Sequence, residues 1–292
     1  FDRQNGAAVP YCNGDEPVGY ACNSGSRSEG GAVGASATWE NGYAGLSFGN
    51  FRSNYGTVAE PVVRIGMRSN TWSAASEVRE LGQFFKTLKL KFGQTDYQHT
   101  EFDAGVAQTT FKNKGHEGRV ELTHAAWGPF SGGAIGAQFG KSDFSAIGAE
   151  SLIPITQSRA DAMFAYEEMI MGKLRLSFGG RVEHASVRSE GGGPNEADPA
   201  RALFGAPRYG GAQQRDFNLG SGSLGVVYRL TPAYALAANL SYTERAPTYY
   251  ELYANGPHAA TGAYEIGNAG FNPLLVAPGV IVTSVSGSTF AP

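Results

Sequence analysis

Four side chains in this sequence have the chemistry of a metal site. His99, Glu101 and Asp103 alternate along one short segment, and His258 lies far away near the C-terminal end. Imidazole and carboxylate groups are ligands for borderline metals such as zinc when they converge. The alternative is that all four are ordinary solvated loop residues, since no compact ligand motif such as H-E-x-x-H joins them.

Two other features carry possible chemistry. Cys12 and Cys22 lie in a loop-like stretch without a nearby histidine, so we expect a disulfide between them and an oxidising compartment. Gly45-Leu46-Ser47-Phe48-Gly49 matches the G-x-S-x-G pattern, but it lies inside an alternating, strand-like segment rather than at a strand-to-helix turn. We therefore predict no catalytic residue and no enzyme activity.

The composition favours a β-rich chain. The 292 residues include 41 glycines and 12% aromatic residues, with 17% charged residues and a formal net charge of -3. No basic block suggests nucleic acid as a partner. No apolar run approaches the ~18 residues of a transmembrane helix, but a transmembrane barrel remains open because its strands hide hydrophobicity in alternation.

Alternating segments and turn signals predict about ten strands. Connections at one end are short, as at Glu40-Asn41-Gly42 and Met171-Gly172-Lys173. Those at the other end are longer, and the longest spans residues 189–215. Outer-membrane barrels sort their loops in this way, with short periplasmic turns and long extracellular loops. The expected strands are 32–39, 43–51, 62–79, 85–100, 110–126, 131–145, 156–170, 174–188, 217–230 and 235–243, with connections at 52–61 and 103–108 among them.

The two faces of these strands differ in polarity. In residues 174–183, Leu, Leu, Phe, Gly and Val alternate with Arg, Ser, Gly, Arg and Glu. In a membrane barrel the apolar face meets lipid and the polar face lines the lumen. The residues that we expect to face the lumen include Arg119, Glu121, Arg175, Arg181 and Glu183.

Residues 244–268 carry the most specific signal. They read E-R-A-P-T-Y-Y-E-L-Y-A-N-G-P-H-A-A-T-G-A-Y-E-I-G-N, which closely resembles a segment of TonB-dependent outer-membrane receptors, in particular their zinc-uptake branch. Residues 92–101, 109–115 and 138–148 are similar to other segments of the same branch. The resemblance implies a barrel of about 22 strands, plugged by an N-terminal domain and energised through a TonB box. It also implies that His258, Glu101 and His99 take part in metal capture.

The resulting prediction is an all-β protein, an antiparallel transmembrane β-barrel present in part, as about ten strands of a larger barrel with the plug domain absent. We divide it into a disulfide-containing loop segment (1–30), a receptor barrel region (31–268) and a low-complexity tail (269–292). The expected function is import of zinc or a metal chelate, such as a siderophore or haem, across the outer membrane of a Gram-negative cell. The expected partners are outer-membrane lipid, the transported solute and, through the plug, the TonB complex. A passive porin or structural barrel is the alternative.

Overall fold

The structure is a computed structural model that describes residues 2–3, 23–58, 60, 62–148, 151–193, 208–258, 263–267, 282–284 and 289–290. Cys12 and Cys22 lie outside the described residues, and so does most of the segment 269–292. Among the described residues, no helix is long and apolar enough to cross a membrane.

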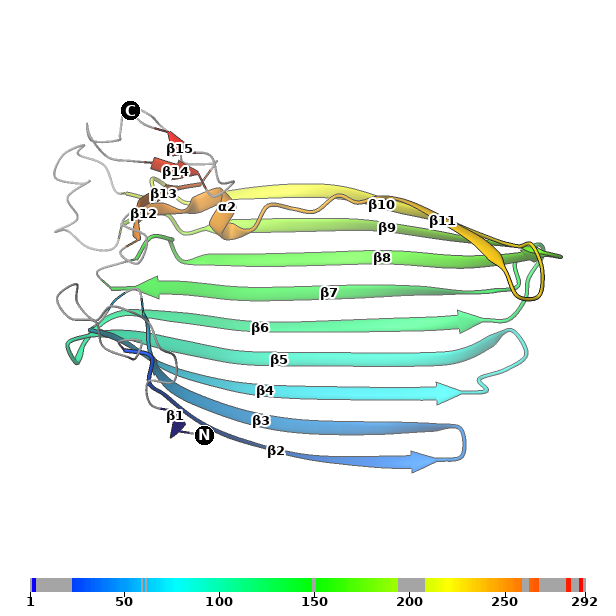
Figure 1. The fold of residues 1–292 in the computed structure, drawn as a ribbon, viewed down its shortest axis with the longest axis horizontal. Helices are drawn as coiled ribbons and strands as arrows, with labels where there is room; N and C mark the ends of the chain where they lie inside the picture. Colours follow the sequence, from blue (N-terminus) through cyan, green and yellow to red (C-terminus); the bar gives the residue numbers. More distant parts are fainter. Residues whose placement is uncertain are drawn as a thin grey trace.

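One antiparallel sheet makes up most of the fold (Figure 1). Its strands follow one another in sequence order from β1 to β11, so every neighbour along the chain is also the neighbour in space. Their bounds are β1 Asp2–Arg3, β2 Ser26–Trp39, β3 Gly42–Gly56, β4 Val63–Arg79, β5 Phe85–Asp103, β6 Val106–His124, β7 Gly132–Ile147, β8 Thr156–Met171, β9 Leu174–Ser189, β10 Gln213–Arg229 and β11 Ala235–Tyr242.

The predicted ten-stranded, all-β barrel fold is confirmed by the long strands β2–β11. The sheet is a partial barrel, because the order of the described strands ends at β11 and does not return to β2. Most long strands have 14–19 residues, well above the usual 5–6 residues of globular strands. Such lengths suit strands that cross a bilayer at a tilt and continue beyond it.

The connection predicted at 103–108 is wrong in length. The structure has a two-residue turn, Ala104–Gly105, between β5 and β6. Both residues have positive φ, +46° and +85°, which is the backbone of a type I′ hairpin. Loops at this end of the sheet therefore vary in length, from this two-residue turn to the long connection between β9 and β10.

Two other predicted boundaries also differ from the structure. The loop predicted at 52–61 is shorter, because β3 continues to Gly56. The strand β2 begins at Ser26 rather than near Ala32.

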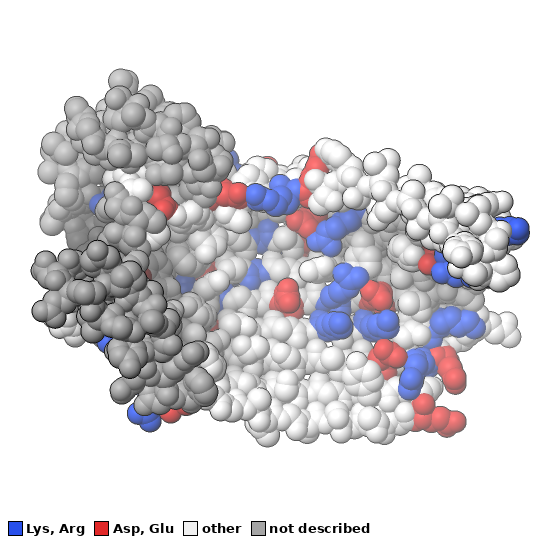
Figure 2. All heavy atoms as spheres, viewed as in Figure 1, with Lys and Arg blue, Asp and Glu red and all other residues white. Residues whose placement is uncertain are grey.

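The register gives the sheet two different faces. Paired residues lie on the same face, so Lys91, Arg119, Gln138 and Glu183 share one side, which we call the charged face. Figure 2 shows charged side chains gathered over the middle strands of one side of the molecule. On the other side, the apolar face, the exposed side chains include Leu46, Trp72, Leu90, Phe92, Val120, Phe139, Met163, Val182 and Leu240.

A second, smaller unit follows β11 at the end of the sheet that carries the longest loop (Figure 1). It consists of the short helix α2 (Tyr249–Tyr253) and a four-stranded sheet. The strands are β12 Asn255–His258, β13 Ala263–Ile266, β14 Val282–Ser284 and β15 Thr289–Phe290. The last two belong to the segment that the sequence predicted as a low-complexity tail.

Candidate functional site

The five residues predicted to face the lumen all lie on the charged face. Arg119 and Glu121 are two positions apart on β6, and Arg175, Arg181 and Glu183 occupy matching alternate positions on β9. The exposed apolar side chains lie on the opposite face of the sheet, so the two faces differ in polarity as the alternation predicted.

Charges on this face are arranged in short, paired groups. The Glu121 carboxylate accepts from Arg119 at 2.8 Å and lies 3.6 Å from the Lys89 ammonium on the neighbouring strand. Arg119 also stacks over the ring of Phe164, with its guanidinium carbon 4.0 Å from the ring centre. A cross-strand network of this kind holds the long side chains in fixed positions on the charged face.

A second group repeats this pattern on β9. The guanidinium of Arg181 donates two hydrogen bonds to one carboxylate oxygen of Glu183, including one of 3.1 Å from Nε. It also donates to the side-chain oxygen of Gln138 at 3.3 Å. The charged face therefore offers hydrogen-bonding groups of both signs rather than charges of one sign.

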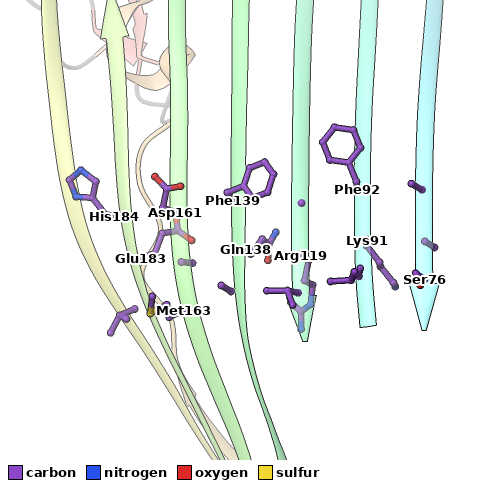
Figure 3. A pocket seen from close by; sticks show the side chains of 18 of the residues that line it. Ser76, Lys91, Phe92, Arg119, Gln138, Phe139, Asp161, Met163, Glu183 and His184 are labelled. Carbon is purple, nitrogen blue, oxygen red and sulfur yellow. The ribbon is translucent and has the colours of Figure 1, made fainter. Parts of the chain in front are cut away.

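A groove of about 1080 Å³ crosses β3 to β10 at mid-height (Figure 3). Its lining changes from polar to apolar along the strands, since Asp161 is followed by Met163 and, on the next strand, His184 is preceded by Val182. On β8 and β9 the groove thus separates polar from apolar side chains of the apolar face, whereas on β5 and β7 it is flanked by apolar side chains such as Phe92 and Phe139.

Hydrogen bonds to β10 hold the segment that follows β11. Glu244 accepts from the backbone N–H of Gly220 at 2.6 Å and from the Tyr242 hydroxyl at 2.7 Å. Thr248 is the N-cap of α2, and its hydroxyl and backbone N–H exchange hydrogen bonds with Glu251 in a capping box. In the sequence E-R-A-P-x-x-x-E, the last glutamate is therefore Glu251, the residue that completes the capping box at the start of α2.

The helix is fixed to the end of the sheet by apolar packing. Leu252 and Tyr253 are buried against Val187 on β9, with Phe217 of β10 beside them. The Tyr253 hydroxyl donates to the Val187 carbonyl at 2.9 Å. A cavity of about 700 Å³ lies beneath the segment 245–249, and its floor is formed by residues of the charged face such as Glu183.

His258 is paired with a residue that the sequence analysis did not single out. Its Nδ1 lies 2.6 Å from Oε1 of Glu265 across the β12–β13 hairpin. The other carboxylate oxygen of Glu265 is buried and has no hydrogen-bond partner in the described part of the chain. Burial raises the pKa of the Glu265 carboxyl above its usual range. Glu265 lies within residues 244–268, the segment that resembles the receptors. Its contact with His258 becomes visible only in the register of the β12–β13 hairpin.

His99, Glu101 and Asp103 lie at the end of β5 on the charged face. His99 stacks on the Phe111 ring at 4.5 Å and meets the Tyr97 ring edge-on at 5.6 Å. Its Nδ1 is buried and has no hydrogen-bond partner among the described residues. Tyr97 lies on the charged face beside this histidine.

The structure does not bring the four predicted metal ligands, His99, Glu101, Asp103 and His258, close together. The helix that precedes His258 packs against β8 and β9, and β6, β7 and β8 separate β9 from β5. Within the described ranges, no group of three or more His, Cys, Asp or Glu side chains could hold a metal ion. The arrangement gives two separate places for a ligand, the His258–Glu265 pair and the end of β5.

The fold and the two-faced sheet define a membrane β-barrel, and comparison with known proteins gives its family. Residues 4–275 match the TonB dependent receptor-like β-barrel family. This chain belongs to that family. The predicted membership of the TonB-dependent receptors is therefore confirmed. The prediction that the chain belongs to their zinc-uptake branch is not confirmed.

Solved structures with the same fold share little sequence with this chain. The copper transporter OprC aligns with a TM-score of 0.68 and 15% identity over 80% of this chain. The hemophore receptor HasR of Serratia marcescens, solved with its hemophore HasA and heme, aligns with a TM-score of 0.64 and 13% identity over 84%. The alcaligin receptor FauA of Bordetella pertussis aligns with a TM-score of 0.50 and 15% identity over 75%. The chain spans 39%, 40% and 35% of these three chains, respectively.

Proposed function

We propose that this chain is part of the barrel of a receptor in the Gram-negative outer membrane that imports a scarce metal or metal chelate. Membership of the TonB-dependent receptor family supports this function, and so does the charged interior face. The names of the similar structures refer to copper, to a hemophore with heme, and to alcaligin. In the whole receptor, the paired charges of Arg119 and Glu121 would pack against a plug domain that couples the barrel to the TonB complex.

Zinc is the solute that we propose, and the pair of His258 and Glu265 is the observation that carries it. A neutral imidazole and a carboxylate are both ordinary zinc ligands. The buried, unpartnered oxygen of Glu265 is stabilised when a cation binds to it, because an unsatisfied buried acceptor is costly.

The passive porin is the less favoured alternative. A porin conducts without an energy source, whereas the proposed receptor requires the TonB complex for uptake. Zinc accumulation by cells that carry the full-length receptor should therefore disappear when TonB is deleted. Uptake that continues unchanged without TonB would favour the porin.

Calorimetry with zinc on the refolded full-length receptor tests the site. We expect binding at micromolar or lower Kd, and at least tenfold weaker binding after His258→Ala or Glu265→Gln, since each change removes one ligand of the pair. His184→Ala is the matched control, because His184 is an exposed histidine on the opposite face of the sheet. If every ligand variant still bound zinc as the wild type does, the proposed site would be wrong. If the His184→Ala control lost as much zinc affinity as the ligand variants, the loss would indicate a general folding defect.

A further inference from the structure

A histidine and a glutamate meet near the end of the sheet that lies opposite α2, where the connections are short (Figure 1). The strand pairing places His124 of β6, Gly133 of β7 and Glu167 of β8 in one row on the apolar face. The Nε2 atom of His124 lies 3.0 Å from Oε1 of Glu167. The side chain of His124 is only 6% exposed, so the pair is largely removed from solvent. The proposed function does not use this pair.

The other ring nitrogen of His124 has a partner of its own. Nδ1 lies 2.7 Å from the carbonyl oxygen of Ala125, and since a carbonyl only accepts, the proton of the neutral ring belongs on Nδ1. The lone pair of Nε2 then points toward the Glu167 carboxylate, which also carries only lone pairs. Two acceptors at 3.0 Å repel each other unless a proton or a metal cation joins them. Histidines that bind metals usually hold their second ring N–H in this way.

The second carboxylate oxygen of Glu167 distinguishes these two possibilities. Oε2 is buried and has no hydrogen-bond partner within the described part of the chain. A proton between Nε2 and Oε1 would leave Oε2 unpaired, and a buried acceptor without a partner is destabilising. A divalent cation would interact with Nε2 and with both carboxylate oxygens at once. The unpaired oxygen therefore favours a metal ion.

Gly133 leaves space for such an ion between the two side chains. A Cβ at this position would overlap with Oε2 of Glu167, and would lie 2.5 Å from the carbonyl oxygen of Tyr166 and 2.6 Å from Nε2 of His124. One nitrogen and two oxygen atoms thus converge over the glycine. Two ligands of a tetrahedral zinc ion lie about 3.3 Å apart at bond lengths of ~2.0–2.1 Å. The observed 3.0 Å between Nε2 and Oε1 is close to this separation.

An aromatic ring holds His124 in place. The Phe84 ring stacks on the imidazole, with ring centres 5.4 Å apart and planes at 16°. The backbone N–H of Ala125 donates to the Phe84 carbonyl at 2.8 Å, which keeps Phe84 beside the end of β6. The orientation of the imidazole is therefore fixed by packing and by a hydrogen bond, as a metal ligand requires.

We propose that His124 and Glu167 bind a borderline divalent cation of the zinc type, with the carbonyl oxygen of Tyr166 as a third ligand. Imidazole and carboxylate are ordinary ligands of such ions, and water supplies the remaining position. The ion would join β6 to β8 across β7 and so stabilise three neighbouring strands. This site lies on the apolar face, at the other end of the sheet from His258, and is independent of the transported solute.

Zinc calorimetry tests this proposal on the full-length receptor carrying His258→Ala and Glu265→Gln, a background that lacks the first proposed site. We expect this background still to bind zinc with a micromolar Kd and zinc to raise its Tm. Adding Glu167→Gln should weaken the binding at least tenfold, because an amide is a poor zinc ligand. Adding Glu168→Gln is the matched control. It removes the same charge one residue away on the other face, where Glu168 accepts from the Tyr166 hydroxyl, and should bind within twofold of the background.

The pH dependence provides a second measurement, which needs no variant at the new site. Zinc must displace the proton from the imidazole, so its affinity for the background should fall as the pH is lowered from about 7.5 to 6. Zinc affinity that is constant over this range would contradict a histidine ligand.

Three other results would overturn the proposal. The background could bind no zinc, Glu167→Gln could bind zinc as the background does, or Glu168→Gln could lose as much affinity as Glu167→Gln. The first would mean that a proton alone joins His124 to Glu167, and the other two that Glu167 is not a ligand. Glu167→Gln in the otherwise wild-type receptor separates the two proposals, because it should leave zinc binding at His258 and Glu265 unchanged.

Discussion

Arg245 and Glu251 are joined side chain to side chain by two hydrogen bonds of 2.7 and 2.6 Å, which close the turn leading into α2. Glu251 at the same time accepts from the backbone N–H of Thr248 at 2.8 Å. One carboxylate thus connects the end of the last long strand to the helix that precedes His258. The hydrogen bonds from the Arg245 guanidinium have the largest effect on the pKa of Glu251, and the hydrogen bond from the Thr248 backbone N–H has the next largest. Together they lower this pKa to about 2.

This low pKa predicts an acid-sensitive helix. A carboxyl group whose pKa is lower in the folded state than its unfolded value of ~4.3 stabilises the fold above that value, and loses this effect as the pH falls toward 2. At pH 7, Glu251→Gln should reduce the hydrogen-exchange protection of the Leu252 and Ala254 amides about fivefold, as expected for a lost cap of ~1 kcal/mol.

The control is Glu190→Gln, which changes an exposed carboxylate just beyond β9 and should leave this protection unchanged. Wild-type protection, corrected for the intrinsic exchange rate at each pH, should be constant from pH 7 to 5 and then fall toward the value of the variant. Equal protection at pH 7 and pH 3 would contradict the assigned role of the ion pair.

Two glycines on the charged face of β7 predict opposite responses to the same substitution. A Cβ at Gly136 would overlap with the Phe164 ring and the Val120 carbonyl oxygen, whereas at Gly140 no atom lies within 4 Å. Gly136→Ala should therefore lower the free energy of unfolding by about 1–3 kcal/mol and displace the ring that supports Arg119. Gly140→Ala should be neutral or slightly stabilising, since glycine is a poor strand residue. Denaturant unfolding of the full-length receptor in micelles measures both, and equal losses would show that Gly136 is not packed as described.

The sequence predicted the strands well where one face is apolar and the other polar. In that part the alternation is strong, and in the register Arg119, Glu121, Arg175, Arg181 and Glu183 share one face. After Phe51 on β3, the residues on both faces are polar, since Arg52, Ser53 and Asn54 follow one another, so alternation disappears although the strand continues. This is why residues such as Arg52 and Asn54, which belong to β3, were predicted to lie in a loop.

The candidate site was less predictable because its contacts depend on register. Nothing in the local sequence of Glu265 indicates that it meets His258, since the two are brought together only by the β12–β13 pairing. The structure places His99, Glu101 and Asp103 on one face of β5, which the expected strand end at residue 100 did not predict, and three strands separate β5 from β9. Side chains on different elements can be assigned to one site from sequence only when the topology between those elements is known.

The turn between β5 and β6 was also not predicted, and it gives the last testable consequence. Ala104 and Gly105 form a type I′ hairpin, which requires positive φ at both positions, and Asn-Gly is the pair that adopts it most readily. Alanine at φ +46° is strained by its Cβ, at a cost of about 1–2 kcal/mol. Ala104→Asn should therefore raise the free energy of unfolding by about 0.5–1 kcal/mol, because asparagine tolerates this conformation.

The neighbouring position provides the control for this mechanism. Gly105 has φ +85° and open space around it, so Gly105→Ala adds only backbone strain and no steric overlap. It should lower the free energy of unfolding by about 1 kcal/mol or more. Denaturant unfolding of both variants in micelles measures the two effects. If Ala104→Asn destabilises the barrel while Gly105→Ala does not, the two-residue turn is wrong and the connection has the longer form that the sequence suggested.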